Sequence, residues 1–167
     1  ATNAYQMSAR GLFLLFFQAA ALASGTPHAP LAGAQLAGSG TLRFLGLEVY
    51  QARLWVRPGF TPRTWAHQSL ALELHYARGF SARAIAARSL EELQRQQALT
   101  EAQSERWQAQ LAALLPDVAA GDRLVGVYEP GQGVRFLFNG QPHGHIDDPL
   151  FARLFFGIWL SPQSSEP

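Results

Sequence analysis

The sequence contains no cysteine, so disulfide bonds and thiolate metal sites are excluded. Charge is also scarce: Lys, Arg, Asp and Glu make up 15% of the 167 residues, and the formal net charge is +1. A nucleic-acid-binding protein would carry a clustered basic face, and so few charges do not favour one. The sequence has neither a phosphate-binding glycine loop followed by a helix nor the G-x-S-x-G elbow of serine hydrolases. It therefore predicts no cofactor, no nucleic-acid partner and no catalytic residue.

Two histidines are candidate metal ligands. His143 and His145 lie two residues apart in a predicted strand and precede Asp147 and Asp148. Alternation along a strand would place both imidazoles on one face, where they could bind a metal ion. No further histidine follows nearby, so we interpret the pair as an exposed hairpin edge and predict no metal site.

Hydrophobic residues, in contrast, are abundant. They make up 48% of the chain, which is enough to form a full core in a single domain of this length. They are concentrated first in a compact apolar run over residues 11–21, which follows Met7 and the basic Arg10. With Ala-Leu-Ala at residues 21–23, residues 7–23 have the pattern of a secretory signal peptide.

The signal-peptide interpretation sets the expected organisation of the chain. We expect cleavage after Ala23 and a protein that is periplasmic or secreted. The apolar run is short and is interrupted by Gln18, so no stable membrane span is expected. An apolar N-terminal helix of the folded domain is the alternative. Residues 1–6 are interpreted as upstream sequence, residues 24–37 as a linker rich in Ala, Gly and Pro, and residues 38–167 as the domain.

Alternating apolar and polar residues predict β strands in three parts of the domain. Residues 41–56 alternate, but Gly46 interrupts them, which indicates either two strands or one bent strand with a bulge. Residues 70–76 form a second alternating segment. From residue 121 onward a three-stranded meander is predicted, because Pro130-Gly131 and Asn139-Gly140 are strong turn dipeptides.

Three segments have the spacing and the end signals of helices. The first covers roughly residues 82–96 after Ser81, the second begins with a capping box at Thr100, and the third follows Asp148-Pro149. In the first helix, the charged residues are predicted to face water: Arg83, Arg88, Glu91, Glu92 and Arg95. The second and third helices are predicted to bury three large aromatic side chains: Trp107, Phe155 and Trp159.

The order of strands, two helices, strands and a final helix indicates an α+β fold. We predict an antiparallel sheet of about six strands with the helices packed on one face. In such a layout, a ligand is expected to bind in a cleft between the sheet and the helices.

Several polar residues lie in strands that also carry bulky apolar side chains, and they are candidates for ligand binding. A guanidinium group next to a tyrosine in an apolar cleft could hold a carboxylate or a phenolate. The alternative is that these long side chains lie along the sheet and keep their tips in water. The residues concerned are Arg43, Tyr50, Arg53, Tyr76, Arg123, Tyr128 and Arg135, of which we select Arg43, Tyr50, Arg53 and Arg123.

Several segments resemble the chalcone isomerase-like family, in particular its exported bacterial branch. The resemblance rests on the order and spacing of short stretches between residue 38 and residue 167, among them residues 46–55, 72–78, 138–140 and 155–161. It implies an open-faced β-sandwich, in which a large antiparallel sheet lies under a layer of helices. This agrees with the layout predicted from the residue patterns.

The family includes plant enzymes that close a chalcone into a flavanone and other members that bind fatty acids without catalysis. Matched to the plant enzymes, the chain has Leu45 at the position of a catalytic threonine, and Arg43 lies near but does not match the catalytic arginine. The resemblance therefore implies the fold and a hydrophobic cleft, but not the isomerase site. We predict a non-catalytic binder of a fatty acid or a similar, flavonoid-like hydrophobic molecule. The alternatives are an intramolecular lyase of the chalcone isomerase type and a structural or partner-binding protein.

Overall fold

The computed structural model describes residues 29–161. The predicted signal peptide, residues 7–23, and the upstream residues 1–6 lie outside the described residues. The predicted linker, residues 24–37, lies outside them as far as residue 28.

Six strands form one antiparallel sheet in which each strand pairs with its neighbours in chain order. The strands are β1 (Gln35–Phe44), β2 (Leu47–Val56), β3 (Leu70–Tyr76), β4 (Arg123–Glu129), β5 (Gly133–Phe138) and β6 (Gln141–Ile146). The predicted antiparallel sheet is confirmed. β1 begins at Gln35, so three residues of the segment predicted as a linker belong to the sheet.

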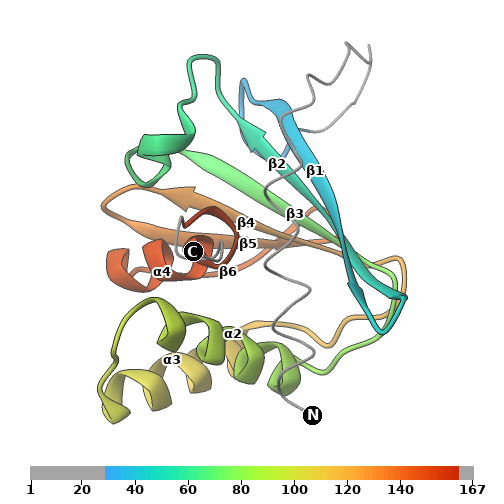
Figure 1. Cartoon of the computed structure of the whole chain (residues 1–167), viewed down its shortest axis with the longest axis vertical. Coiled ribbons are helices and arrows are strands. Elements are labelled where there is room, and N and C mark those ends of the chain that lie inside the picture. The colour runs from blue at the N-terminus through green and yellow to red at the C-terminus, as the bar shows by residue number, and fades with distance from the viewer. Residues whose placement is uncertain (1–28, 162–167) are drawn as a thin grey trace.

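The helices pack on one face of this sheet (Figure 1). They are α2 (Ala82–Gln96), α3 (Glu101–Leu114) and α4 (Pro149–Leu160), with a short 3-10 segment η1 (Pro62–His67) between β2 and β3. Each α-helix begins at the predicted cap: the side chains of Ser81, Thr100 and Asp148 accept hydrogen bonds from backbone N–H groups of the first turn. The fold class predicted from the sequence is therefore confirmed.

Helix α4 lies against the middle of the sheet because its apolar residues surround most of its circumference. Phe151 and Phe156 are fully buried, and the predicted burial of Trp107, Phe155 and Trp159 is confirmed. Phe156 packs over β4 at Gly126, where an added Cβ would lie 3.1 Å from the Phe156 ring. A glycine at this point of β4 thus lets the helix approach the sheet closely.

The other face of the sheet carries a smaller apolar cluster. Leu31 packs there with Trp55, Ala71, Val125 and Val127. Glu73 is also buried on this face, where its carboxylate accepts a hydrogen bond of 3.2 Å from the Trp55 indole. The alternation of β2 and β4 places Arg53 and Arg123 on this same face.

A tight turn at Leu45-Gly46 joins β1 to β2, so the segment that Gly46 interrupts is two strands and not one bent strand. Both turn residues have positive φ angles, 51° for Leu45 and 78° for Gly46. The turn at Asn139-Gly140 between β5 and β6 has nearly the same angles, 50° and 83°. Both pairs of angles are those of a type I′ hairpin turn.

Candidate functional site

A cavity of about 390 Å³ lies between the helix-covered face of the sheet and helices α2 and α4. Its volume falls within the range of about 300–1,000 Å³ typical of small-molecule sites. Apolar and aromatic side chains from four strands, two helices and the adjoining loops line it: Leu42, Val49, Tyr50, Leu74, Tyr76, Phe80, Ala84, Ile85, Leu115, Leu124, Phe155, Ile158 and Trp159.

The floor of the cavity is set by strand alternation and register. Tyr50 of β2 pairs with Tyr76 of β3, and their rings meet edge to face with centroids 5.8 Å apart. Both rings therefore lie on the helix-covered face of the sheet. The Trp159 indole N–H donates a hydrogen bond of 3.0 Å to the Tyr50 hydroxyl, which ties the end of α4 to β2 across the cavity.

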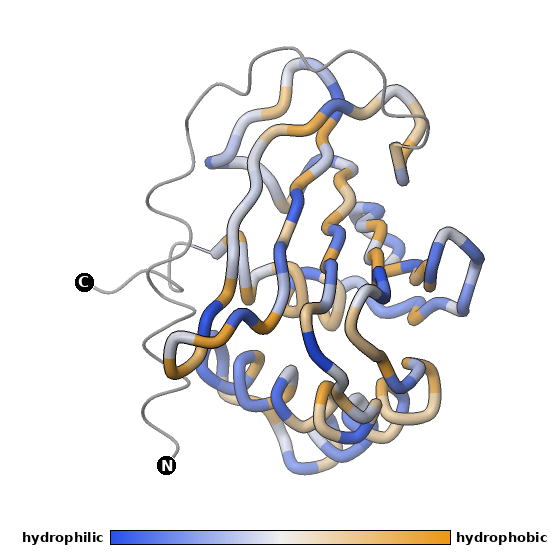
Figure 2. Tube along the Cα trace, turned by 90° about the vertical axis from the view of Figure 1, so that its right-hand side faces the viewer, coloured by the Kyte–Doolittle hydropathy of each residue, from blue (hydrophilic) through white to orange (hydrophobic). Residues whose placement is uncertain are grey.

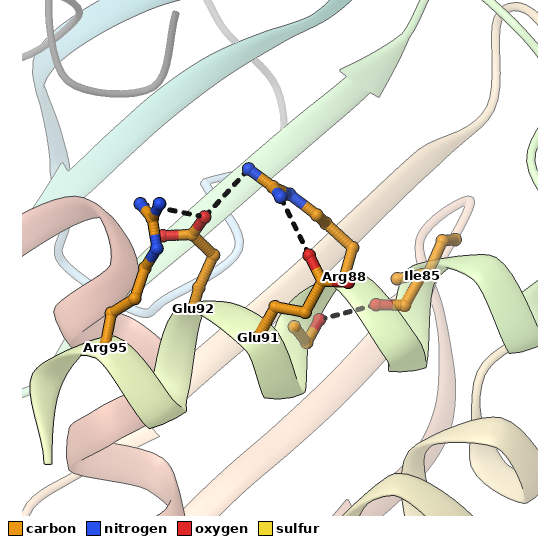
Figure 3. Close-up of polar contacts among 6 residues, drawn as sticks. Ile85, Arg88, Glu91, Glu92 and Arg95 are labelled. Carbon is orange, nitrogen blue, oxygen red and sulfur yellow. Dashed lines mark hydrogen bonds and ion pairs between the residues drawn. The ribbon is translucent and has the colours of Figure 1, made fainter. Parts of the chain in front are cut away.

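All the charged residues that line the cavity come from α2: Arg88, Glu91 and Glu92. Figure 3 shows them along the helix together with Arg95. Arg88 Nη1 lies 2.9 Å from Glu91 Oε2, and Arg88 Nη2 lies 2.8 Å from Glu92 Oε1. Arg95 Nη1 is 3.7 Å from the same Glu92 oxygen. The contacts of Glu92 Oε1 are ionic contacts without hydrogen-bond alignment.

This cluster corrects one prediction from the sequence. Arg88 and Glu92 were expected to face water, yet their side chains are only 24% and 14% exposed and lie at one edge of the cavity. Glu91 lines the same edge and is exposed, as expected. Arg88 follows Ala84 by four residues and Ile85 by three, and both also line the cavity. That spacing puts Arg88 on the same face of the helix, and it was the available signal in the sequence.

Ser89 lines the cavity beside Arg88, but its hydroxyl is already satisfied. It donates a hydrogen bond of 2.8 Å to the Ile85 carbonyl one turn earlier in the helix. The hydroxyl thus has a partner within its own helix, as is common for serine in helices.

Of the four residues predicted to bind a ligand, only Tyr50 lines the cavity. Arg53 and Arg123 lie on the opposite face of the sheet, away from this cavity. Arg43 is exposed next to a register shift of β1, and Leu42 supplies the cavity-lining side chain instead. Residue type alone pointed to arginine and tyrosine. It does not determine which face of the sheet each arginine occupies, because that depends on how the strands pair.

Leu45 also lies elsewhere than the resemblance implied. It is 78% exposed in the β1–β2 turn and is not among the residues that line the cavity. The interpretation that Leu45 replaces a hydrogen-bond donor inside the site is therefore wrong.

The histidine pair does not line this cavity. His145 Nε2 lies 3.2 Å from Asp147 Oδ2, and both side chains are largely exposed. Within residues 29–161, no group of three or more His, Cys, Asp or Glu side chains is placed to hold a metal ion. In the same part of the chain, every helix is too short or too polar to cross a bilayer.

Comparison with known proteins places this geometry in context. The profile of the chalcone isomerase-like family matches residues 29–166. The crystal structure of a fatty-acid binding protein from Arabidopsis thaliana is similar to this chain, with a TM-score of 0.62 at 12% sequence identity; the alignment covers 83% of this chain and 86% of that one. At this identity, the similarity shows a shared fold. No curated protein matches the chain.

Proposed function

We propose that this chain, which belongs to the chalcone isomerase-like family, binds a hydrophobic small molecule with a polar head in the cavity beneath α2 and α4, and that it does so without catalysis. The observation that carries the proposal is the cavity itself: a largely apolar space of about 390 Å³ with charge along one edge only. Burial of a hydrocarbon chain in such a space contributes about 0.8 kcal/mol for each methylene group.

The arrangement of the lining favours an amphipathic ligand over a wholly apolar one. Tyr50 and Tyr76 of the floor and Phe155 and Trp159 of α4 offer apolar surface to a chain or ring system. The charged edge on α2 offers hydrogen-bonding groups to a polar head, and Arg88 is its cation. A fatty acid has both parts, because a guanidinium group pairs well with a carboxylate.

The fold similarity supports the same class of ligand. The similar structure from Arabidopsis thaliana is described as a fatty-acid binding protein. The cavity of this chain lies between the sheet and the helices, where a fold with helices on one face of a sheet can enclose a ligand. We therefore place a fatty acid or a comparable amphipath first among the ligands to test.

The test is to fill the cavity without disturbing the rest of α2. Ser89→Phe adds a ring from a residue that lines the cavity, whereas Arg83→Phe adds the same ring at an exposed position of the same helix. Titration with a fluorescent long-chain fatty acid should show saturable binding to the parent protein and to Arg83→Phe. Binding to Ser89→Phe should be weaker by about tenfold or more, because the ligand loses space for apolar contact.

A thermal melt of each variant accompanies the titration, since overpacking of a core can itself destabilise a protein. Native mass spectrometry of the gently purified protein gives a second readout, a mass increase that matches a bound lipid. The parent protein showing no saturable binding and no co-purified lipid would contradict the proposed function. Equal binding by Ser89→Phe and Arg83→Phe would place the ligand outside this cavity.

A further inference from the structure

The turn between β1 and β2 exposes hydrophobic side chains to solvent. Leu45 is 78% exposed and Leu47 is 51% exposed. Over residues 29–161 the other exposed large hydrophobic side chain is Leu36, which is only 36% exposed and lies near the other end of β1. Figure 2 shows this concentration as hydrophobic colour at the tip of a projecting hairpin. Two neighbouring exposed leucines on one turn are a feature that core packing does not explain.

The backbone of the turn makes the choice of leucine more unusual. Leu45 has a φ angle of 51°, in the left-handed region that β-carbon sterics disfavour for leucine. The β5–β6 turn adopts nearly the same angles with Asn139 at the equivalent position, and asparagine tolerates this conformation well. The chain thus uses a favourable residue at one such turn and a strained, exposed leucine at the other. Strain retained at an exposed position indicates a role outside folding.

The turn lies next to the cavity in the chain and in space. Leu42 lies three residues before Leu45, Val49 lies three residues after Gly46, and both line the cavity. The sides of the hairpin are therefore part of the cavity wall while its tip projects into solvent, at the lower right of Figure 1.

Charged side chains surround the base of the turn. Arg43 and Arg78 are both exposed, and Arg78 Nε donates a hydrogen bond of 3.0 Å to the Glu48 carbonyl, which holds it against the hairpin. Glu48 is also exposed and pairs with Arg43 in the strand register. These three side chains carry a net positive charge, which suits the phosphate groups of lipid heads.

We propose that the Leu45-Gly46 turn inserts into the surface of a phospholipid bilayer and thereby brings the cavity to the membrane from which its ligand is taken up. The proposal rests on the proposed function, because a hydrophobic ligand of low solubility resides mainly in membranes. Apolar side chains at the tip and guanidinium groups behind them match the layers of a bilayer interface in order: hydrocarbon first, phosphate second. The alternative is that the turn binds another protein, and the vesicle experiments below contain no other protein.

The absence of cysteine allows a direct test with single labels. Leu47→Cys places one thiol beside the turn, and Leu36→Cys places one at the other exposed leucine, far along β1. Each full-length variant is labelled with a polarity-sensitive fluorophore and mixed with vesicles of phosphatidylcholine and phosphatidylglycerol. We expect the emission of the label at Leu47→Cys to shift to the blue and to increase by about twofold or more, with little change for the label at Leu36→Cys. Only the label at residue 47 would enter the apolar layer of the bilayer. An unchanged spectrum at Leu47→Cys, or equal changes at both sites, would overturn the proposal.

A second variant separates membrane docking from ligand binding. Leu45→Asn reproduces the Asn-Gly pair of the β5–β6 turn, so the fold should be retained and the melting temperature should not fall. We expect uptake of a fluorescent fatty acid from vesicles to be about fivefold slower or more, whereas affinity for the same fatty acid added from solution stays unchanged. Equal uptake rates for Leu45→Asn and the parent protein would overturn the docking proposal. If the parent protein does not bind the fatty acid added from solution, the proposed function is contradicted. The labelled variants would still test membrane docking in that case.

Discussion

The ion pairs on α2 predict that the cavity distinguishes ligands by the charge of their heads. Arg88 is the cation of the lining, but it already contacts Glu91 and Glu92 at 2.9 Å and 2.8 Å. A ligand carboxylate must therefore compete with carboxylates of the protein. The perturbations that expose this competition are Arg88→Gln and Glu91→Gln, with Arg83→Gln as a control on the exposed side of α2.

The expected effect of each substitution on ligand affinity follows from how exposed the paired glutamate side chains are. The Glu91 side chain is 52% exposed, and a surface ion pair three residues apart on a helix contributes only about 0.2–0.5 kcal/mol. The Glu92 side chain is 14% exposed and also contacts Arg95, so a ligand carboxylate should displace Glu91 first. A hydrogen bond to a charged group contributes about 1.5–3 kcal/mol, so the new pair with the ligand outweighs the lost one.

The assay compares dodecanoic acid with dodecanol in displacing a fluorescent fatty acid, because the two ligands share a chain and differ in head group. Glu91→Gln should tighten binding of the acid by about twofold and leave the alcohol unchanged, since it removes one competitor. Arg88→Gln should weaken binding of the acid by about tenfold or more and weaken binding of the alcohol far less. Arg83→Gln should change neither. Equal losses of both ligands in Arg88→Gln would refute the reasoning, because they would show that Arg88 contributes shape and not charge recognition.

Two further predictions concern stability and catalysis. Burial raises the pKa of Tyr128 above its ordinary value of 10.0, and nearby Arg153 only partly lowers it. The folded state therefore keeps a proton that the unfolded chain loses, so the contribution of Tyr128 to the free energy of unfolding should be constant below about pH 10 and be lost as pH rises through the folded pKa. Chemical denaturation from pH 8 to 11 checks this, and the fall should be smaller in Tyr128→Phe; an equal fall would assign it to other groups. For catalysis, we expect no excess of one flavanone enantiomer from a hydroxychalcone, because Glu91 and Glu92 neutralise Arg88 where an enolate would need positive charge. Chiral chromatography of the product would reveal any such excess.

Local signals in the sequence predicted the fold well because capping residues and turn dipeptides mark where helices and strands begin and end. Ser81, Thr100 and Asp148 mark the three helix starts in the sequence, and all three act as caps in the structure. The turn at Asn139-Gly140 likewise follows from a dipeptide that favours positive φ angles. The turn at Leu45-Gly46 was missed as a hairpin, because leucine gives no such signal.

The site was less predictable because it depends on which face each side chain occupies. A register shift of one residue exchanges the two faces of a strand, and β1 contains two irregularities. Arg43, Arg53 and Arg123 were therefore chosen by residue type and not by position. Arg88 was not selected because its position on the helix was expected to face water, whereas in the structure it pairs with Glu91 and Glu92 at the edge of the cavity.

The cavity persists beside a closely packed core because α4 is fixed at both ends and in the middle. At its start, Asp148 accepts a hydrogen bond of 3.0 Å from the Trp107 indole of α3. Near its centre, the Leu154 carbonyl accepts one of 2.7 Å from Gln96 of α2, and at its end Trp159 donates to Tyr50 of β2. A helix held in this way cannot collapse onto the floor of strands to close the space, so the apolar walls are preformed. Under the proposed function, selection among ligands is then left to the less constrained groups at the edge of the cavity, namely the ion pairs of α2.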